Sequence, residues 1–462
     1  MSTVPVNRPG YLVLCNPISN EGHLDSWHVM FIDLLVKSGW KVIAATEDPV
    51  GLQKKLDARG LSGTDRIIVA GPAAGQRATL LSSGRQRWTR WNAYCDARLF
   101  QRQWRGRGAQ DGLLRNMAAY ITDAAVLRLQ TIIQTLHRVY AAVRRQSHTP
   151  QDRQVTTHID PGDFRERINQ LEAQYPGQIL GVLNMYVDAY MQDQAHWQQF
   201  SLAQDIPWMG LCITPSKEPC EGYYGVPSYR GTCFLDESVC AHYQAVMPQR
   251  HFEFLPDITE TALPEQPSPL ALEITRIAAG RKIVFMGGSI GKQKNLACWY
   301  TLMAMLDPAQ WFFVQIGRIN KNNLTAEDEA ALDKTLSEPP PNLYIRPEYL
   351  RDERFFNEII SISDVVFAVY RDFARSSNML SKAAYFEKPI LVTKGCLMGE
   401  RVSFYGIGKA VSQDDVQDMF DGLLALGHIP ELKNNFYRYR QGFSEAIVQT
   451  KLSTFVQACL EA

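Results

Sequence analysis

The sequence predicts an α/β protein built from two doubly wound parallel sheets in two domains. Three observations support this prediction. Strand-like apolar segments alternate with helical segments from residue 11 to 71, the same alternation returns from 282 to 393, and a segment with four prolines lies between them at 251–269. Strands and helices that alternate every 10–15 residues or so are typical of parallel sheets. A chain of 462 residues also has room for two hydrophobic cores.

Charge and composition exclude several classes of protein. Lys+Arg and Asp+Glu both number 48, so there is no net charge to attract a nucleic acid. The nine cysteines form no C-x-x-C pair and no Cys/His cluster at zinc spacing, which predicts reduced thiols in a cytoplasmic protein without a structural metal. The first ten residues, MSTVPVNRPG, do not have the pattern of a secretory signal. No stretch approaches the roughly 18 apolar residues of a membrane span.

The first domain is expected to cover residues 1–255. The predicted strands are 11–16, 41–46, 66–71, 178–190 and 206–214, and helices are predicted at 27–39, 50–60 and, as an insertion into this domain, about 76–150. Gly39 is a typical residue for a helix end. A linker follows at 250–269, where prolines and acidic residues accumulate.

The second domain is expected to cover residues 256–440. Its predicted strands are 282–288, 311–317, 342–347, 364–370 and 389–393, and its predicted helices are 270–280, 298–306, 353–363 and 378–386. Residues 441–462 are expected to form a C-terminal helix that packs back on the first domain. The sequence therefore predicts two Rossmann-like domains that face each other across a cleft.

A glycine-rich loop follows the first strand of the second domain. In GGSIGKQKN, Gly288 and Ser289 leave the backbone accessible, and Lys294 lies where a helix is about to begin. Glycines allow a diphosphate to approach the backbone, and a lysine here supplies positive charge to its oxygens. The alternative is a tight strand–helix turn with a solvated lysine. The order of residues is not that of a Walker A loop.

A second anion-binding feature is predicted in ARSSNMLSKAAYF. Ser376 or Ser377 is expected to cap a helix that begins near Asn378, and the helix dipole favours an anion at that end. Arg375 lies just before the helix and is suited to a bidentate phosphate contact. Lys382 lies within the helix, where it either contacts a second phosphate or extends to solvent.

The second domain resembles the C-terminal half of GT-B glycosyltransferases, particularly the retaining group that uses nucleotide sugars. In that group a glycine ends the first strand, a Lys-Asn pair follows six residues later, and an aspartate begins a later strand. Here Gly288, the pair Lys294-Asn295, Asp364 and the strand that opens at Pro389 occur in this order. The resemblance covers about 170 residues by order and spacing, and the first domain is similar through its strand, its GHL loop and its helix.

The sequence departs from the family at three positions. Ser289 stands where the family has an arginine, and Ala374 and Lys382 stand where it has two glutamates. In the family, the first glutamate lies near the donor sugar and the second contacts the ribose. The resemblance therefore implies the fold and a nucleotide-sugar donor, while the roles of these glutamates do not carry over.

Two residues of the first domain are candidates for catalysis. His23 lies in the loop SNEGHLDSWH, whose equivalent in GT-B enzymes faces the donor phosphates and the acceptor, and Glu21 lies beside it. His23 is therefore a candidate for acceptor contact or proton transfer, and the alternative is a polar turn. Asp188 follows a buried strand, where it either orients an acceptor hydroxyl, acts as a base or caps the next helix.

The segment from Arg85 to Arg107 contains seven arginines interleaved with tryptophan, tyrosine and phenylalanine. Three interpretations are open. It is a structural helix, a helix on a membrane surface that serves a lipid-linked acceptor, or a nucleic-acid contact, and the neutral total charge argues against the last.

The sequence therefore predicts a cytoplasmic glycosyltransferase, either free or peripheral to the inner face of the membrane. It would transfer a sugar from a nucleotide-diphosphate sugar to a hydroxyl of a small-molecule, glycan or lipid-linked acceptor. No cofactor, metal or nucleic acid is expected. Two alternatives remain: a non-catalytic GT-B protein that binds a nucleotide or sugar, and a nucleotide-sugar epimerase.

Overall fold

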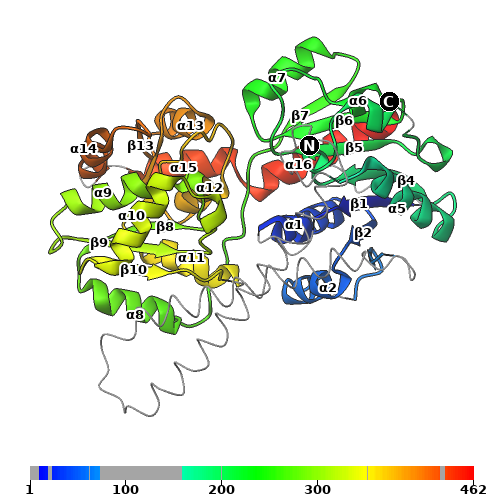
Figure 1. Ribbon diagram of the computed structural model, residues 1–462. Helices are drawn as coiled ribbons and strands as arrows, with labels where there is room; N and C mark the ends of the chain where they lie inside the picture. Colours follow the sequence, from blue (N-terminus) through cyan, green and yellow to red (C-terminus); the bar gives the residue numbers. More distant parts are fainter. Residues whose placement is uncertain are drawn as a thin grey trace, which may run out of the picture. The chain divides into compact units, whose positions relative to one another are not determined.

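The computed structural model describes residues 10–18, 23–61, 63–72, 159–198, 200–350, 352–426 and 432–462. The predicted insertion at 76–150, including the segment 85–107, lies outside these residues. Within them are two parallel sheets, each with helices on both faces (Figure 1).

The first sheet has seven strands in the order β3-β2-β1-β4-β5-β6-β7. Its strands are β1 (Tyr11–Asn16), β2 (Val42–Thr46), β3 (Ile67–Ala70), β4 (Ile179–Asn184), β5 (Trp208–Cys212), β6 (Tyr229–Phe234) and β7 (His251–Phe254). Alternate residues of β1 belong to different cores. Leu12 and Leu14 pack on one face of the sheet, and Val13 and Cys15 pack on the other.

The helices of this part are α1 (His23–Lys37), α2 (Pro49–Ala58), α5 (Pro161–Gln174), the short α6 (Gln194–Trp197) and α7 (Glu237–Val246). Side chains of α1 and α2 pack against Leu12 and Leu14, whereas Phe164 of α5 and Tyr243 of α7 pack on the opposite face. Both faces of the central strands are therefore buried, which explains why β1, β2, β4 and β5 are mostly apolar.

The second sheet has six strands in the order β10-β9-β8-β11-β12-β13. Its strands are β8 (Lys282–Gly287), β9 (Trp311–Ile316), β10 (Leu343–Arg346), β11 (Val365–Ala368), β12 (Ile390–Thr393) and β13 (Gly408–Val411). The helices of this part are α8 (Pro269–Ala278), α9 (Leu296–Met305), α10 (Ala326–Ser337), α11 (Glu353–Ile362), α12 (Asn378–Tyr385), α13 (Leu397–Tyr405), α14 (Val416–Leu426) and α15 (Leu432–Gly442).

The last helix, α16 (Glu445–Glu461), packs in the core of the first sheet although it follows the second sheet in the chain. Its buried residues Leu452 and Phe455 lie in the same core as Leu12 of β1. In Figure 1, α16 is the red helix beside the strands of the first sheet. None of the described helices has both the length and the apolar character needed to cross a bilayer.

Several predicted boundaries are corrected by the structure. The predicted linker begins too early, because His251–Phe254 is β7, which pairs with β6. The predicted strand 178–190 ends at Asn184, and a 3₁₀ turn, Val187–Ala189, follows it. The sequence analysis did not identify β6, α6, α7, α10, α13, β13 or α14, and it placed one C-terminal helix where the structure has two, α15 and α16.

Candidate functional site

The candidate site lies at the carboxyl edge of the second sheet, between β8 and β11. These two strands are neighbours, while β9 continues the sheet on the side of β8 and β12 on the side of β11. The connections after β8 and after β11 therefore leave the sheet in opposite directions. In open α/β sheets, ligands bind in the crevice at such a switch point.

Close backbone contact shapes the loop after β8. Gly288 has φ of +100°, a conformation that favours glycine. The neighbouring Gly317, at the end of β9, has φ of +147°, and a β-carbon there would lie 1.8 Å from the carbonyl oxygen of Gly288. Both glycines are thus required by the fold. Ser289, the next residue, is exposed.

The side chain of Lys294 lies beside this glycine loop. Its Nζ donates a hydrogen bond to the hydroxyl of Tyr370 (2.8 Å) and lies 4.1 Å from the centroid of the Tyr370 ring. The same nitrogen is 3.7 Å from the point where a β-carbon on Gly288 would lie. Because Tyr370 follows β11, the contact joins the two loops of the switch point and holds a half-buried ammonium group beside accessible backbone.

A buried polar network fixes the position of Lys294. The next residue, Asn295, has φ of +55° and is fully buried. Its amide oxygen accepts a hydrogen bond from Arg371 (2.8 Å), and Arg371 also forms an ion pair with the fully buried Asp328 (3.0 Å). Asp328 accepts a hydrogen bond from the backbone N–H of Ala297 at the start of α9 (3.0 Å). These contacts fix the end of the glycine loop.

The start of α12 lies after β11 at the same edge. Ser376 and Ser377 were the two predicted capping residues, and Ser377 is the N-cap. Its hydroxyl accepts a hydrogen bond from Met379 N–H (3.3 Å). Asn378 is the first residue of the helix and is half-buried. Arg375, half-buried, donates a hydrogen bond to the hydroxyl of Thr214 (2.7 Å), a residue that follows β5 of the first sheet.

The predicted phosphate contact by the Ser376 side chain needs correction. Its hydroxyl donates to Asp257 (2.7 Å) and accepts a hydrogen bond from Arg401 (3.0 Å), and the residue is buried. Arg401 also forms an ion pair with Glu237 (2.7 Å). Burial raises the pKa of Asp257 to about 6. Ser376 thus belongs to an internal polar cluster, and its hydroxyl is occupied by Asp257 and Arg401.

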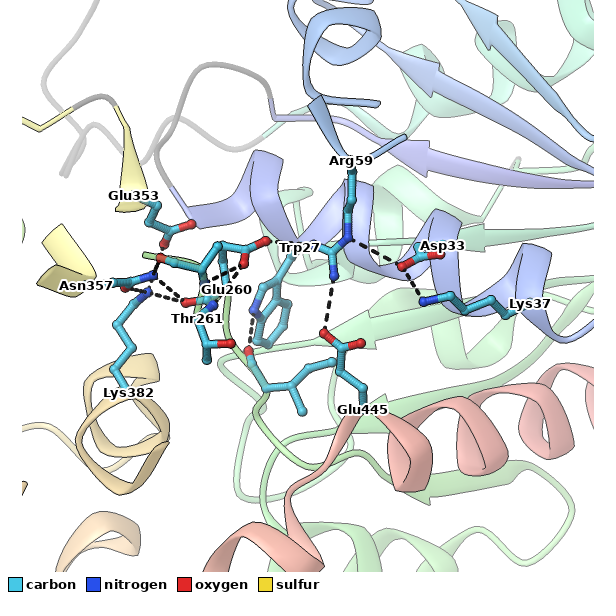
Figure 2. A network of polar contacts seen from close by, with 12 residues as sticks. Trp27, Asp33, Lys37, Arg59, Glu260, Thr261, Glu353, Asn357, Lys382 and Glu445 are labelled. Atoms are coloured by element: carbon cyan, nitrogen blue, oxygen red, sulfur yellow. Dashed lines mark hydrogen bonds and ion pairs between the residues drawn. The ribbon is translucent and has the colours of Figure 1, made fainter. Parts of the chain in front are cut away.

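Lys382 needs the same correction (Figure 2). It is 1% exposed, and its ammonium donates to the carbonyl oxygen of Glu260 (2.8 Å) and to the side-chain oxygen of Asn357 (2.5 Å). The carboxylate of Glu353 is 3.5 Å away. Burial lowers the pKa of Lys382, and the nearby carboxylates oppose that shift. Because protein oxygens surround its ammonium, Lys382 is left out of the proposed phosphate contacts.

Figure 2 also shows that Glu260 has partners on two sides. Its backbone oxygen accepts from Lys382 and Asn357, while its carboxylate forms an ion pair with Arg59 (2.8 Å) at the end of α2. Arg59 in turn contacts Asp33 of α1 (3.4 Å). The segment between the two sheets is therefore held by charged and polar contacts at one residue.

The structure places the two first-domain candidates differently. His23 is the first residue of α1, and its side chain lies outside what is described, as does Glu21. The carboxylate of Asp188 accepts hydrogen bonds from the backbone N–H groups of Ile213 (3.3 Å) and Thr214 (3.2 Å). Burial raises the pKa of Asp188, and these hydrogen bonds oppose the shift. Asp188 thus fixes the loop after β5, a role that the sequence analysis did not consider.

Sequence analysis missed Tyr370, Arg371 and Thr214. All three follow strands at a carboxyl edge, which was the only signal available for them. The contacts that matter join Lys294 to Tyr370 and Arg375 to Thr214, and their partners are 76 and 161 residues apart in the chain.

Two parallel sheets of this topology in one chain define the GT-B fold, which confirms the fold class and the resemblance at the level of architecture. A glycosyltransferase from Rickettsia africae is similar with a TM-score of 0.57 and 10% identity, over 98% of this chain and 99% of the other. The N-terminal domain of Candida albicans trehalose-6-phosphate phosphatase has a TM-score of 0.56 and 13% identity, over 100% and 98%.

A trehalose-6-phosphate synthase is also similar, with a TM-score of 0.53 and 10% identity over 98% of both chains. No family model matches the sequence, and no curated protein shows significant sequence similarity to it. The common feature of this protein and its structural neighbours is therefore the fold.

Proposed function

We propose that the protein is a glycosyltransferase that moves a sugar from a nucleotide-diphosphate sugar to a hydroxyl group of an acceptor. The observation that carries this proposal is the placement of Lys294 Nζ beside Gly288, at the switch point of the second sheet. A cation next to accessible backbone suits a diphosphate, and so does the N-terminus of α12 on the connection after β11.

The chemistry follows from the charge of the leaving group. When the bond between the sugar and the diphosphate breaks, negative charge accumulates on the departing phosphate oxygens. The ammonium of Lys294 and the dipole of α12, which begins at Asn378, stabilise that charge, and Arg375 supplies a second cation. Gly288 and Ser289 let the phosphates approach the backbone. The first-sheet part binds the acceptor.

Structural neighbours support the proposal. The Rickettsia africae protein is a glycosyltransferase, and another neighbour is a trehalose-6-phosphate synthase. We further propose that transfer needs no metal, because Lys294 and Arg375 neutralise the leaving group, and that the protein works in the cytoplasm. Contact with a membrane through 85–107 remains a prediction, because these residues lie outside the described structure.

The test is incubation of the purified protein with a panel of UDP-, GDP-, ADP- and TDP-sugars, with separation of the products. We expect one donor to raise the melting temperature and to be hydrolysed slowly to the nucleoside diphosphate. Lys294→Met should weaken both effects. Sugar interconversion without release of a diphosphate would identify an epimerase, and stabilisation without turnover would identify a non-catalytic binding protein. Both outcomes would contradict the proposal.

A further inference from the structure

Arg375 is held in one orientation by two contacts. Its Nη1 donates to the hydroxyl of Thr214 (2.7 Å), and its guanidinium carbon lies 5.2 Å from the centroid of the Phe373 ring. Among the residues that the structure describes, no other hydrogen bond of this guanidinium is found. An arginine has five N–H donors in a rigid planar group. The remaining donors of Arg375 are therefore oriented by the contacts with Thr214 and Phe373.

Thr214 is itself fixed by Asp188. One carboxylate oxygen of Asp188 accepts the backbone N–H of Thr214 (3.2 Å), and the other accepts that of Ile213 (3.3 Å). Asp188 lies in the 3₁₀ turn after β4, and Thr214 lies in the loop after β5. A carboxylate that accepts two neighbouring backbone N–H groups holds a loop in a single conformation. The position of the Thr214 hydroxyl is therefore set by Asp188.

We propose that Asp188 and Thr214 are positioning residues for Arg375, and that they orient its remaining N–H donors for the diphosphate of the donor. This inference rests on the proposed function. Its physical basis is entropy, because an arginine side chain that is already ordered loses less freedom when it binds an anion. Residues that follow strands of the first sheet then determine how tightly the second-sheet part binds its donor.

The test removes the Thr214 hydroxyl group, which accepts the hydrogen bond from Arg375. Thr214→Val keeps the shape of the side chain and deletes the hydrogen-bond acceptor, whereas Thr214→Ser keeps the acceptor. We expect loss of this hydrogen bond to weaken nucleotide binding roughly five- to tenfold, which corresponds to about 1–1.4 kcal/mol. Arg375→Ala removes the group on which Thr214 is proposed to act.

Isothermal titration of the full chain with UDP, GDP, ADP and TDP identifies the diphosphate that binds the wild type. For that nucleotide we expect Thr214→Val to bind about five- to tenfold more weakly and Thr214→Ser to bind within about twofold of the wild type. If Thr214 acts through Arg375, Thr214→Val should have no further effect when combined with Arg375→Ala. Circular dichroism and thermal unfolding verify that each variant is folded.

Two results overturn the inference while the proposed function stands. Wild-type affinity in a folded Thr214→Val variant is one of them. The other is a double variant whose loss of binding free energy equals the sum of the losses in the two single variants. If none of the four nucleotides binds the wild-type protein, the diphosphate site itself is refuted, and the inference is refuted with it.

Discussion

Asp257 is a buried carboxyl group whose ionisation opposes folding. It is 2% exposed, and burial raises its pKa from 3.8 to about 6. Since the folded pKa is the higher one, the native state binds the proton more tightly than the unfolded state. The resulting stabilisation is complete below the unfolded value and is lost as the pH rises through about 6. Over two pKa units this amounts to about 3 kcal/mol.

Asp257→Asn should remove this pH dependence. The unfolding free energy of the variant minus that of the wild type should rise by about 2–3 kcal/mol between pH 4 and pH 7, as measured by urea denaturation. Asp205→Asn, at an exposed aspartate, is the matched control. A difference for Asp257→Asn that does not change with pH would contradict the assignment.

Lys294 and Lys382 should respond to substitution in opposite ways. Lys382→Met leaves the oxygens of Glu260 and Asn357 with one donor fewer, and the unfolding free energy should fall by about 1–3 kcal/mol with no change in nucleotide affinity. Lys294→Met should weaken nucleoside diphosphate binding about tenfold or more with little effect on stability. Urea denaturation and isothermal titration measure the two quantities. Weakened nucleotide binding by Lys382→Met would restore Lys382 to the site.

Single residues also show where sequence analysis stops. The cap at Ser377 was predictable because capping depends on residues next to each other in the chain. The role of Lys382 was not, because its partner Glu260 lies 122 positions away in sequence and only the folded structure brings them together. Ser376 differs from Ser377 for the same reason, since its partner Asp257 is 119 positions away.

At the scale of elements, α16 belongs to the hydrophobic core of the first sheet. It follows the second sheet in the chain, yet Leu452 and Phe455 lie in the core of the first. Leu452→Ala should therefore lower the unfolding free energy by about 2–5 kcal/mol, the usual cost of a buried leucine-to-alanine change. Thr454→Ala, on the exposed side of the same helix, should change it by less than about 0.5 kcal/mol. Similar values for both variants in urea denaturation would contradict this packing.

The elements also show which sequence patterns were sufficient to predict a strand. Strands such as β8 and β9 were predictable because both faces are buried and the segments are mostly apolar. The four-residue edge strand β7 was assigned to the linker, because its alternating residues, HFEF, directly precede a proline-rich stretch. Pairing with β6 makes it a strand, and that contact is tertiary.

At the scale of the whole molecule, the proposed mechanism predicts that sugar transfer needs no metal ion. Lys294 and Arg375 are proposed to neutralise the departing diphosphate, so transfer should persist in excess EDTA at a rate within about twofold of the untreated enzyme. Loss of turnover in EDTA with recovery on addition of Mg²⁺ or Mn²⁺ would show that protein cations are insufficient. Product formation from the preferred nucleotide sugar is the quantity to measure.

The fold of the described residues was predictable from the sequence, while the side-chain contacts at the candidate site were not. Alternation of strands and helices, together with the order of Gly288, Lys294 and Asp364, was enough to predict the GT-B architecture. The contact of Arg375 with Thr214 was not predictable, because these residues follow strands of different sheets. Periodicity specifies each sheet separately and carries no information about such contacts.

A crystal structure of the chain with its preferred nucleoside diphosphate would test the central claim most directly. The phosphates should lie within hydrogen-bond distance of Lys294 Nζ and of the backbone at Gly288 and Ser289, with the start of α12 beside them. A nucleotide bound at the first sheet, or at any place away from the β8–β11 switch point, would contradict the account.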